Sequence, residues 1–150
     1  MSQNWRIYLD ACCLNRPFDD QNQPRIALEA QAILTILRKC QSAQWQLITS
    51  TALDVELNQT PDLERLSNVK TILTIARVKV LSSQILENRV RELQQLGFTG
   101  YDAAHLASAE QGHADVFLST DDRLIKRAKR HFRLIQITVD NPVPWLMQST

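Results

Sequence analysis

The sequence predicts an α/β protein in which helices cover a parallel β-sheet. Five short apolar runs have the length of buried strands, and segments with helical periodicity lie between them. Parallel strands need crossover connections, and helices supply them. The chain has 150 residues, of which 44% are hydrophobic, and it contains no Gly/Ser-rich stretch that could act as a linker. We therefore expect residues 1–150 to form a single domain.

The expected strands are the short runs dominated by apolar side chains. Such runs are typical of strands that are buried on both faces of a sheet. In chain order they are "WRIYL" at 5–9, "WQLITS" at 45–50, "VKVLS" at 78–82, "ADVFLS" at 114–119 and "RLIQITV" at 133–139.

The expected helices occupy most of the chain between these strands. The first begins at Pro24, a residue favoured at the first helical position, and the second and third are separated by Pro61. The fourth ends at Gly97, as helices often do. The polar stretch 15–24 is expected to be a loop. In chain order the expected helices are residues 24–40, 52–59, 62–76, 82–97, 101–112 and 122–132.

Composition narrows the classes of function. The net charge of +1 excludes a bulk basic excess, so any binding of nucleic acid must rest on local features. The three cysteines are an odd number in a chain with no export signal, which favours a reducing, cytoplasmic location. No apolar run approaches the roughly 18 residues of a membrane span, so no membrane association is expected.

Four acidic residues follow the expected strands. Asp10 comes directly after the first strand, Glu56 lies in the helix after the second, Asp102 opens the helix at 101–112, and Asp121 follows the fourth strand. Ligands of parallel α/β sheets bind at the carboxyl ends of the strands, so these side chains can face one edge. Two carboxylates about 4 Å apart repel by about 4 kcal/mol at an effective dielectric of about 20. If the four converge, they must be partly protonated or hold cations such as Mg²⁺ or Mn²⁺, which can activate water for phosphodiester hydrolysis.

Each acid also has a structural interpretation. Asp102 and Asp121 can complement the dipoles of the helices that they open, next to Ser and Thr cap candidates in "TGYD" and "STDD". Glu56 can belong to a solvated helix face. Asp10 is the hardest to explain by capping, because it closes an apolar strand. Periodicity alone leaves both interpretations open.

Four segments resemble a known family. They are "IYLDACCLN", "STALDVEL", "GYDAAHLASAEQGHADVFLSTDDRLIKRAKR" and "VDNPVPWL". Over nearly its whole length the chain resembles a PIN domain, the nuclease fold of VapC-type toxins in bacterial toxin–antitoxin systems. The resemblance implies a three-layer α/β/α PIN-like fold with a central, mostly parallel sheet of about five strands.

The resemblance also implies a reaction and partners. It makes Asp10, Glu56, Asp102 and Asp121 the catalytic, metal-binding residues of a Mg²⁺- or Mn²⁺-dependent ribonuclease. Metal-activated water would attack the RNA, with no side chain as covalent nucleophile. A homodimer and a cognate antitoxin that blocks the acidic groove are further expectations.

Three residues near these acids are accessory candidates. Many relatives have Ser, Thr or Asn where this chain has Cys12, and a thiol is a poorer hydrogen-bonding group. Ser119 stands where Thr is usual, and Asp122 could replace Asp121 if the loop runs differently. Cys13 is interpreted as a packing residue, and His105 as a packing or hydrogen-bonding residue rather than a catalytic one.

The densest basic segment follows Asp121. It supplies Arg123, Lys126 and Arg127 as candidates for contact with RNA phosphates, and Arg16 is a further candidate beside the first acid. The alternative is an ordinary solvated helix face with basic residues near its C-terminus.

The sequence therefore favours a metal-dependent endoribonuclease, the toxin of a toxin–antitoxin pair. The alternative is a PIN-fold module that binds RNA or protein with weak or no catalysis, for which Cys12 is the sequence hint. A DNA-directed nuclease of the flap-endonuclease type would need large DNA-holding insertions, and 150 residues leave no room for them.

Overall fold

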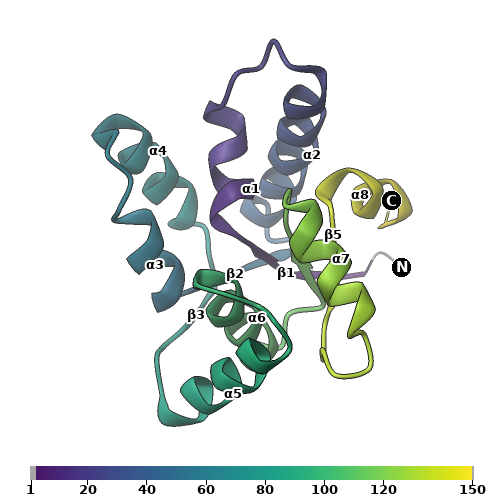
Figure 1. Cartoon of the computed structure of the whole chain (residues 1–150). Coiled ribbons are helices and arrows are strands. Elements are labelled where there is room, and N and C mark those ends of the chain that lie inside the picture. Colours follow the sequence, from purple (N-terminus) through teal and green to yellow (C-terminus); the bar gives the residue numbers. More distant parts are fainter. Residues whose placement is uncertain (1–2, 150) are drawn as a thin grey trace.

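A five-stranded, entirely parallel sheet forms the centre of the molecule, with helices on both faces (Figure 1). The computed structural model describes residues 3–149. The strand order is β3-β2-β1-β4-β5. The strands are β1 (Arg6–Leu9), β2 (Gln46–Ser50), β3 (Val78–Val80), β4 (Val116–Leu118) and β5 (Thr138–Asp140). This confirms the predicted α/β class, and the sheet is parallel throughout.

Eight α-helices and one 3-10 turn occupy the rest of the described chain. Side-chain caps begin several of them, including Ser50 at α3, Asp62 at α4 and Ser83 at α5. Pro24 opens α2 as predicted. The helical elements are α1 (Ala11–Asn15), η1 (Arg16–Phe18), α2 (Pro24–Gln41), α3 (Thr51–Leu57), α4 (Leu63–Leu73), α5 (Gln84–Gln95), α6 (Tyr101–Gln111), α7 (Asp122–Arg130) and α8 (Pro142–Ser149).

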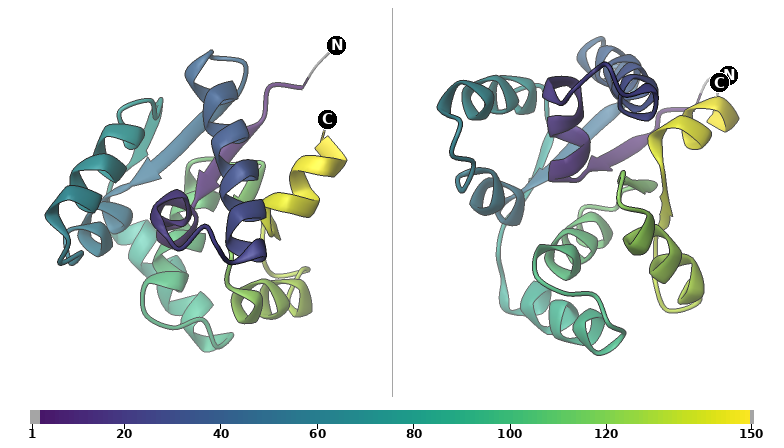
Figure 2. Two further views of the ribbon diagram at one scale, coloured as in Figure 1. Left: turned by 90° about the horizontal axis from the view of Figure 1, so that it is seen from above. Right: turned by 45° about the horizontal axis from the view of Figure 1, so that its top comes forward.

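The alternation of side chains along the strands builds two cores. In β1, Ile7 and Leu9 enter one hydrophobic cluster while Tyr8 enters the other. The first cluster lies under α1, α2, α3, α4 and α8, and the second under α5, α6 and α7 (Figure 2). The molecule therefore has the three-layer α/β/α arrangement that was expected.

Three segments differ from the sequence prediction. Residues 133–137 form a loop, not the start of a strand, because Ile135 packs beneath α7 while Leu134 remains exposed, and β5 begins only at Thr138. Residues 15–18 of the expected loop are helical, because Asp10 caps α1, which ends at Asn15, and Pro17 suits the start of η1. The unpredicted helix α8 begins at Pro142.

All three tryptophans of the chain gather in one place. Trp145 of α8 makes edge-to-face contacts with Trp5 and Trp45, and both pairs of ring centroids are 5.5 Å apart. Because Trp5 precedes β1 and Trp45 precedes β2, this cluster lies at the amino-terminal edge of the sheet.

The opposite edge contains the point where the strand order reverses. The chain leaves β1 towards β2 on one side, while β4 pairs with β1 on the other. The backbone N–H of Asp10 donates to the carbonyl of Leu118 at 3.3 Å, so the ends of β1 and β4 are adjacent. Ligands of open α/β sheets bind at such a position. Within residues 3–149, no helix is both long and apolar enough to cross a bilayer.

Candidate active site

Asp10 is a buried carboxyl at the junction of β1 and α1, with only 5% of its surface exposed. Its Oδ1 accepts hydrogen bonds from the Cys13 backbone N–H at 3.0 Å and from the Cys12 thiol at 2.9 Å. Asp10 is thus the N-cap of α1, and the prediction that capping explains this residue least was wrong. Burial, and next the adjacent Cys12, raise the pKa of the Asp10 carboxyl well above its usual range. An ionised Asp10 needs further stabilisation.

The loop from β4 to α7 brings a second acid to Asp10. The Ser119 hydroxyl accepts a hydrogen bond from the Asp121 backbone N–H at 3.0 Å, lies 3.6 Å from the Cys12 sulfur, and partly offsets the rise in the pKa of Asp10. Asp121 caps α7 by accepting from the N–H groups of Arg123 and Leu124. The cap is therefore the acid itself rather than the Thr of "STDD". Capping occupies Asp121 Oδ1, at 3.0 and 3.3 Å from the two nitrogens.

The pKa of Asp102 is affected by the charges of the other three predicted acids. It lies in the first turn of α6, which is capped by Gly100 rather than by Thr99. Burial raises the pKa of Asp102 to about 6, and repulsion from Asp10 and Asp121, and to a smaller extent from Glu56, adds to the effect. The four predicted acids therefore face one another at the carboxyl edge of the sheet. Among the described residues, none of Asp10, Asp102 and Asp121 forms an ion pair with Lys or Arg.

Glu56 comes to the same edge from α3 and is held by a histidine. Its Oε1 lies 2.6 Å from Nε2 of His105, a residue of α6 with 2% exposure. His105 Nδ1 lies 2.7 Å from the Tyr8 hydroxyl. The structure thus gives His105 the hydrogen-bonding role that was predicted. Tyr8 was missed, because an aromatic residue within an apolar strand carries no sequence signal of a polar contact.

A comparison with protein-family models fits this arrangement. The model of the PIN domain matches residues 7–130, which span the elements that carry all four acids. The chain belongs to the PIN domain family. PIN domains are generally nucleases. Among curated proteins, no significant match was found.

Solved structures with the same fold include two microbial proteins. The crystal structure of PAE2754 from Pyrobaculum aerophilum is 15% identical, with a TM-score of 0.55 and coverage of 98% of this chain and 90% of that chain. VapBC2 from Rickettsia felis, solved bound to a DNA fragment from their promoter, is 12% identical, with a TM-score of 0.55 and coverage of 91% and 98%. At such identities these likenesses establish the fold of this PIN domain.

The donor atoms of this PIN domain fit a hard divalent cation. The four acids supply oxygen ligands. Burial raises the pKa values of Asp10 and Asp102, and repulsion from the other acids adds to the rise at Asp102, so a cation would favour the ionised forms of both. Within residues 3–149, no three Asp, Glu, His or Cys side chains are close enough to hold an ion by themselves. Mg²⁺ is usually held by only one or two carboxylates and keeps several waters, so three converging side chains are not required.

Asp122, next to Asp121, is engaged elsewhere in the PIN domain. Its two oxygens accept from Arg25 of α2 at 2.8 and 2.9 Å, and Arg25 also donates to the Thr120 carbonyl at 3.1 Å. Arg25 lowers the pKa of Asp122. Of the two adjacent acids, Asp121 is the one whose charge acts on Asp102.

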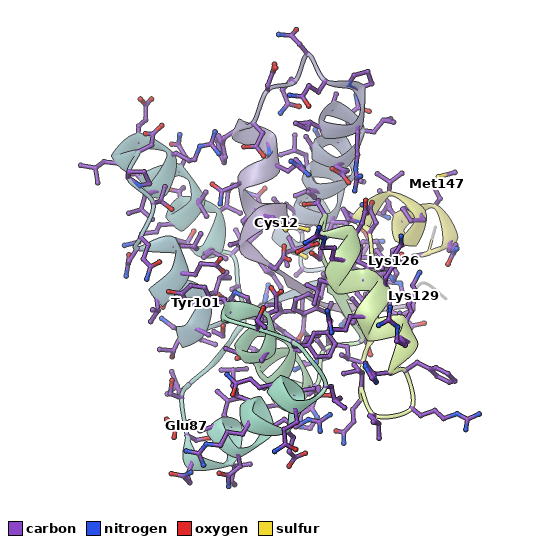
Figure 3. The ribbon with its side chains drawn as sticks, viewed as in Figure 1. Cys12, Glu87, Tyr101, Lys126, Lys129 and Met147 are labelled. Atoms are coloured by element: carbon purple, nitrogen blue, oxygen red, sulfur yellow. The ribbon has the colours of Figure 1, made fainter. Side chains whose placement is uncertain are left out.

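The basic candidates fall into two groups. Arg16 contacts Asp19 at 3.2 Å and the buried Glu29 at 3.0 Å. Arg127 is half-buried, and its guanidinium lies against Gly97, where a Cβ on residue 97 would clash with the guanidinium. Arg123 and Lys126 are exposed on α7. Figure 3 shows Lys126 and Lys129 along this helix, and Cys12 on α1 near the middle of the molecule. Of the four basic candidates, Arg123 and Lys126 are therefore the exposed ones, and neither forms an ion pair within the described residues.

Proposed function

We propose that this PIN domain is a cytoplasmic, metal-dependent endoribonuclease that uses Mg²⁺ or Mn²⁺. The observation that carries the proposal is the raised pKa of Asp102, to about 6, which Asp10, Asp121 and Glu56 all help to raise. Asp102 is close enough to the other three carboxyl groups to be repelled by them, and within residues 3–149 none of the four has a lysine or arginine partner. Such an arrangement lowers the stability of a metal-free protein, and a cation that binds substrate phosphate would offset the loss.

In this proposal Asp10, Glu56, Asp102 and Asp121 hold the ion or ions. A bound divalent ion supplies an activated water and stabilises negative charge on the phosphate and the leaving oxygen. Asp10 is fixed by the α1 backbone and Asp121 by the α7 backbone, so both are oriented before an ion arrives. The Cys12 thiol donates to Asp10 instead of acting as a nucleophile.

The exposed basic residues of α7 fit the substrate side of the proposal. Arg123 lies two residues after Asp121, the N-cap of α7, and Lys126 lies one turn further along the helix. Both can neutralise RNA phosphates beside the cut. The likeness to VapBC2 supports a role as the toxin of a toxin–antitoxin pair under the control of a cognate antitoxin. We further propose that the protein acts as a homodimer.

Cleavage assays with two acid variants and a matched control test this function. Purified protein is incubated with diverse RNAs and Mg²⁺ or Mn²⁺, and EDTA is added to a parallel sample. We expect Asp10→Asn and Asp121→Asn each to lower cleavage at least about 100-fold, because each removes a proposed ligand charge. Asp122→Asn removes the neighbouring charge, which is already paired with Arg25, and should retain cleavage.

Two results would count against the ribonuclease. Intact RNA in every metal condition, together with RNA binding by the wild type, would support the alternative of a PIN-fold binding module. Cleavage that survives in Asp10→Asn and in EDTA would indicate a contaminating nuclease.

A further inference from the structure

Glu56 is the end of a chain of four hydrogen-bonded side chains. Ser50 Oγ lies 2.6 Å from the Tyr8 hydroxyl, which lies 2.7 Å from His105 Nδ1, and His105 Nε2 lies 2.6 Å from Glu56 Oε1. The four residues come from β2, β1, α6 and α3. We call this chain of side chains the Ser50–Glu56 relay.

Only the Glu56 end of the relay reaches solvent. Ser50 and Tyr8 have no exposed surface, and His105 is 2% exposed, whereas the Glu56 side chain is 33% exposed. Water therefore cannot replace a missing partner along the buried part. Every proton in that part needs an acceptor within the relay.

The contacts of Ser50 determine which group donates and which accepts in each hydrogen bond of the relay. Its oxygen accepts from the Leu53 backbone N–H at 3.0 Å, and no described acceptor other than the Tyr8 oxygen is within hydrogen-bond distance of its own proton. Ser50 must therefore donate to Tyr8. Burial raises the pKa of Tyr8 well above its usual range, so the phenol keeps its proton and donates it to His105 Nδ1.

This direction assigns the state of the histidine. With Nδ1 accepting, the ring carries its proton on Nε2, which then donates to Glu56 Oε1. A proton on Nδ1 would force Tyr8 to donate to Ser50 and would leave the buried Ser50 proton without an acceptor. A doubly protonated ring fails for the same reason. One arrangement alone satisfies every group in the relay.

We propose that His105 is a positioning residue, which the Ser50–Glu56 relay fixes as the Nε2-protonated tautomer so that it holds the Glu56 carboxylate in place at the acidic edge. The inference rests on the proposed metal-dependent function for its purpose. Glu56 Oε1 is occupied by His105, and Oε2 accepts no hydrogen bond from any residue between 3 and 149, so it is free to bind an ion. Without His105, the flexible Glu56 side chain would lose its only hydrogen-bonding partner in the described chain.

The tautomer can be measured directly by ¹⁵N-detected NMR of the metal-free protein. The chain contains three histidines, and a His105→Gln spectrum identifies the signals of His105. We expect wild-type His105 to show one protonated nitrogen, Nε2, and Tyr8→Phe to show a mixture of tautomers. Tyr101→Phe is the matched control, because its hydroxyl accepts from Gln59 at 2.6 Å and does not reach His105. A protonated Nδ1 in the wild type would overturn the inference.

The positioning role has its own readout in Mn²⁺ affinity. Titration followed by electron paramagnetic resonance of free Mn²⁺ should give a dissociation constant about 10-fold higher for Tyr8→Phe and His105→Ala, as is typical when partners of metal ligands are removed. His105→Gln can place an amide N–H near the position of Nε2 and should recover much of the affinity. Thermal melting identifies any variant that fails to fold. In that case, the Mn²⁺ affinity of His105→Gln compared with that of His105→Ala decides whether His105 has the positioning role.

The outcomes separate this inference from the proposed function. Equal Mn²⁺ affinity in the wild type, Tyr8→Phe and His105→Ala would overturn the positioning role and leave the metal-dependent function standing. A wild-type protein that binds no Mn²⁺ would overturn the metal-dependent function and the purpose of positioning together.

Discussion

Two buried carboxyl groups in this PIN domain have similar burial and opposite surroundings. Glu29 on α2 is 2% exposed and meets Arg16 at 3.0 Å, Arg25 at 3.1 Å and the Asn141 amide at 2.7 Å. Asp10 is 5% exposed, accepts hydrogen bonds from the Cys12 thiol and the Cys13 backbone N–H, and forms no ion pair with a lysine or arginine of residues 3–149. Burial is therefore common to both carboxyl groups. The difference between them is the cations beside Glu29, and this difference fits the structural role of Glu29 and the proposed metal-binding role of Asp10.

The two regions are connected through a single arginine. Arg25 contacts Glu29 and also holds Asp122 and the carbonyl of Thr120, the two neighbours of Asp121. The Glu29 region, whose buried carboxylate is paired with arginines, therefore fixes the loop that carries Asp121, an acid without such a partner among the described residues. Removing charge from each region should have opposite effects on stability, and the predictions below test that difference.

The largest effect is expected at Glu29. Glu29→Gln should lower the free energy of unfolding by about 3 kcal/mol, because the mostly buried Arg16 would lose the buried one of its two carboxylate partners. Urea denaturation measures this change. Glu92→Gln is the control, since Glu92 forms an exposed pair with Arg89 and should matter little. Equal stability of both variants would remove the distinction between the two regions.

Metal binding should stabilise the region around Asp10. Mn²⁺ at about 100 times its dissociation constant should raise the free energy of unfolding of the wild type by about 2.7 kcal/mol. The same addition to Asp10→Asn should have much less effect, because a ligand charge is gone. Thermal melting with and without Mn²⁺ measures both. A similar shift in both proteins would place the ion elsewhere.

Asp102→Asn is expected to raise the free energy of unfolding, by less than Glu29→Gln lowers it. Its folded pKa of about 6 lies above the unfolded value of about 4, so the ionised carboxyl destabilises the fold. This penalty is absent below about pH 4 and complete above about pH 6. In EDTA at pH 7.5, Asp102→Asn should be more stable than the wild type by about 1 kcal/mol, after allowance for solvent screening.

The pH dependence separates this repulsion from helix capping. The advantage of Asp102→Asn should shrink as the pH falls from 7.5 to 4.5, which chemical denaturation at the two values measures. A variant less stable than the wild type at both pH values would mean that Asp102 serves chiefly the dipole of α6.

The smallest effect is expected at Cys12. A hydroxyl is a stronger donor than a thiol, so Cys12→Ser should improve the hydrogen bond to Asp10 and favour its ionised form. We expect Mn²⁺ affinity and RNA cleavage to rise by about two- to threefold, which corresponds to less than about 1 kcal/mol. Titration and initial rates measure the two quantities. A loss of activity would mean that the thiol itself is required.

The features that could be predicted from the sequence are those that depend on a local pattern of residues. Four of the five strands were found from their apolar runs, because strands buried on both faces leave an uninterrupted signal, whereas the fifth run, 133–139, overlaps β5 only at residues 138 and 139. The four acids were placed at one edge because the carboxyl ends of parallel strands meet there. The strand predicted from residue 133 failed because its apolar residues pack as a loop beneath α7, and that contact has no periodicity.

The partners of the acids could not be predicted in the same way. Glu56 and His105 are separated by 49 residues, and Arg25 and Asp122 by 97, so their contacts exist only in the folded chain. Asp10 shows the limit most clearly. The sequence marked it as an acid that closes a strand, whereas its capping of α1 depends on a helical turn that the sequence pattern did not reveal.

The tryptophan cluster has a practical consequence for optical work on this protein. The protein has three tryptophans, Trp5, Trp45 and Trp145. They pack edge to face at the sheet edge opposite the acids. Their fluorescence should therefore report the opening of that corner during unfolding, with little quenching by a paramagnetic ion held at the other edge. Emission spectra give a clean record of denaturation in the same samples in which Mn²⁺ is varied.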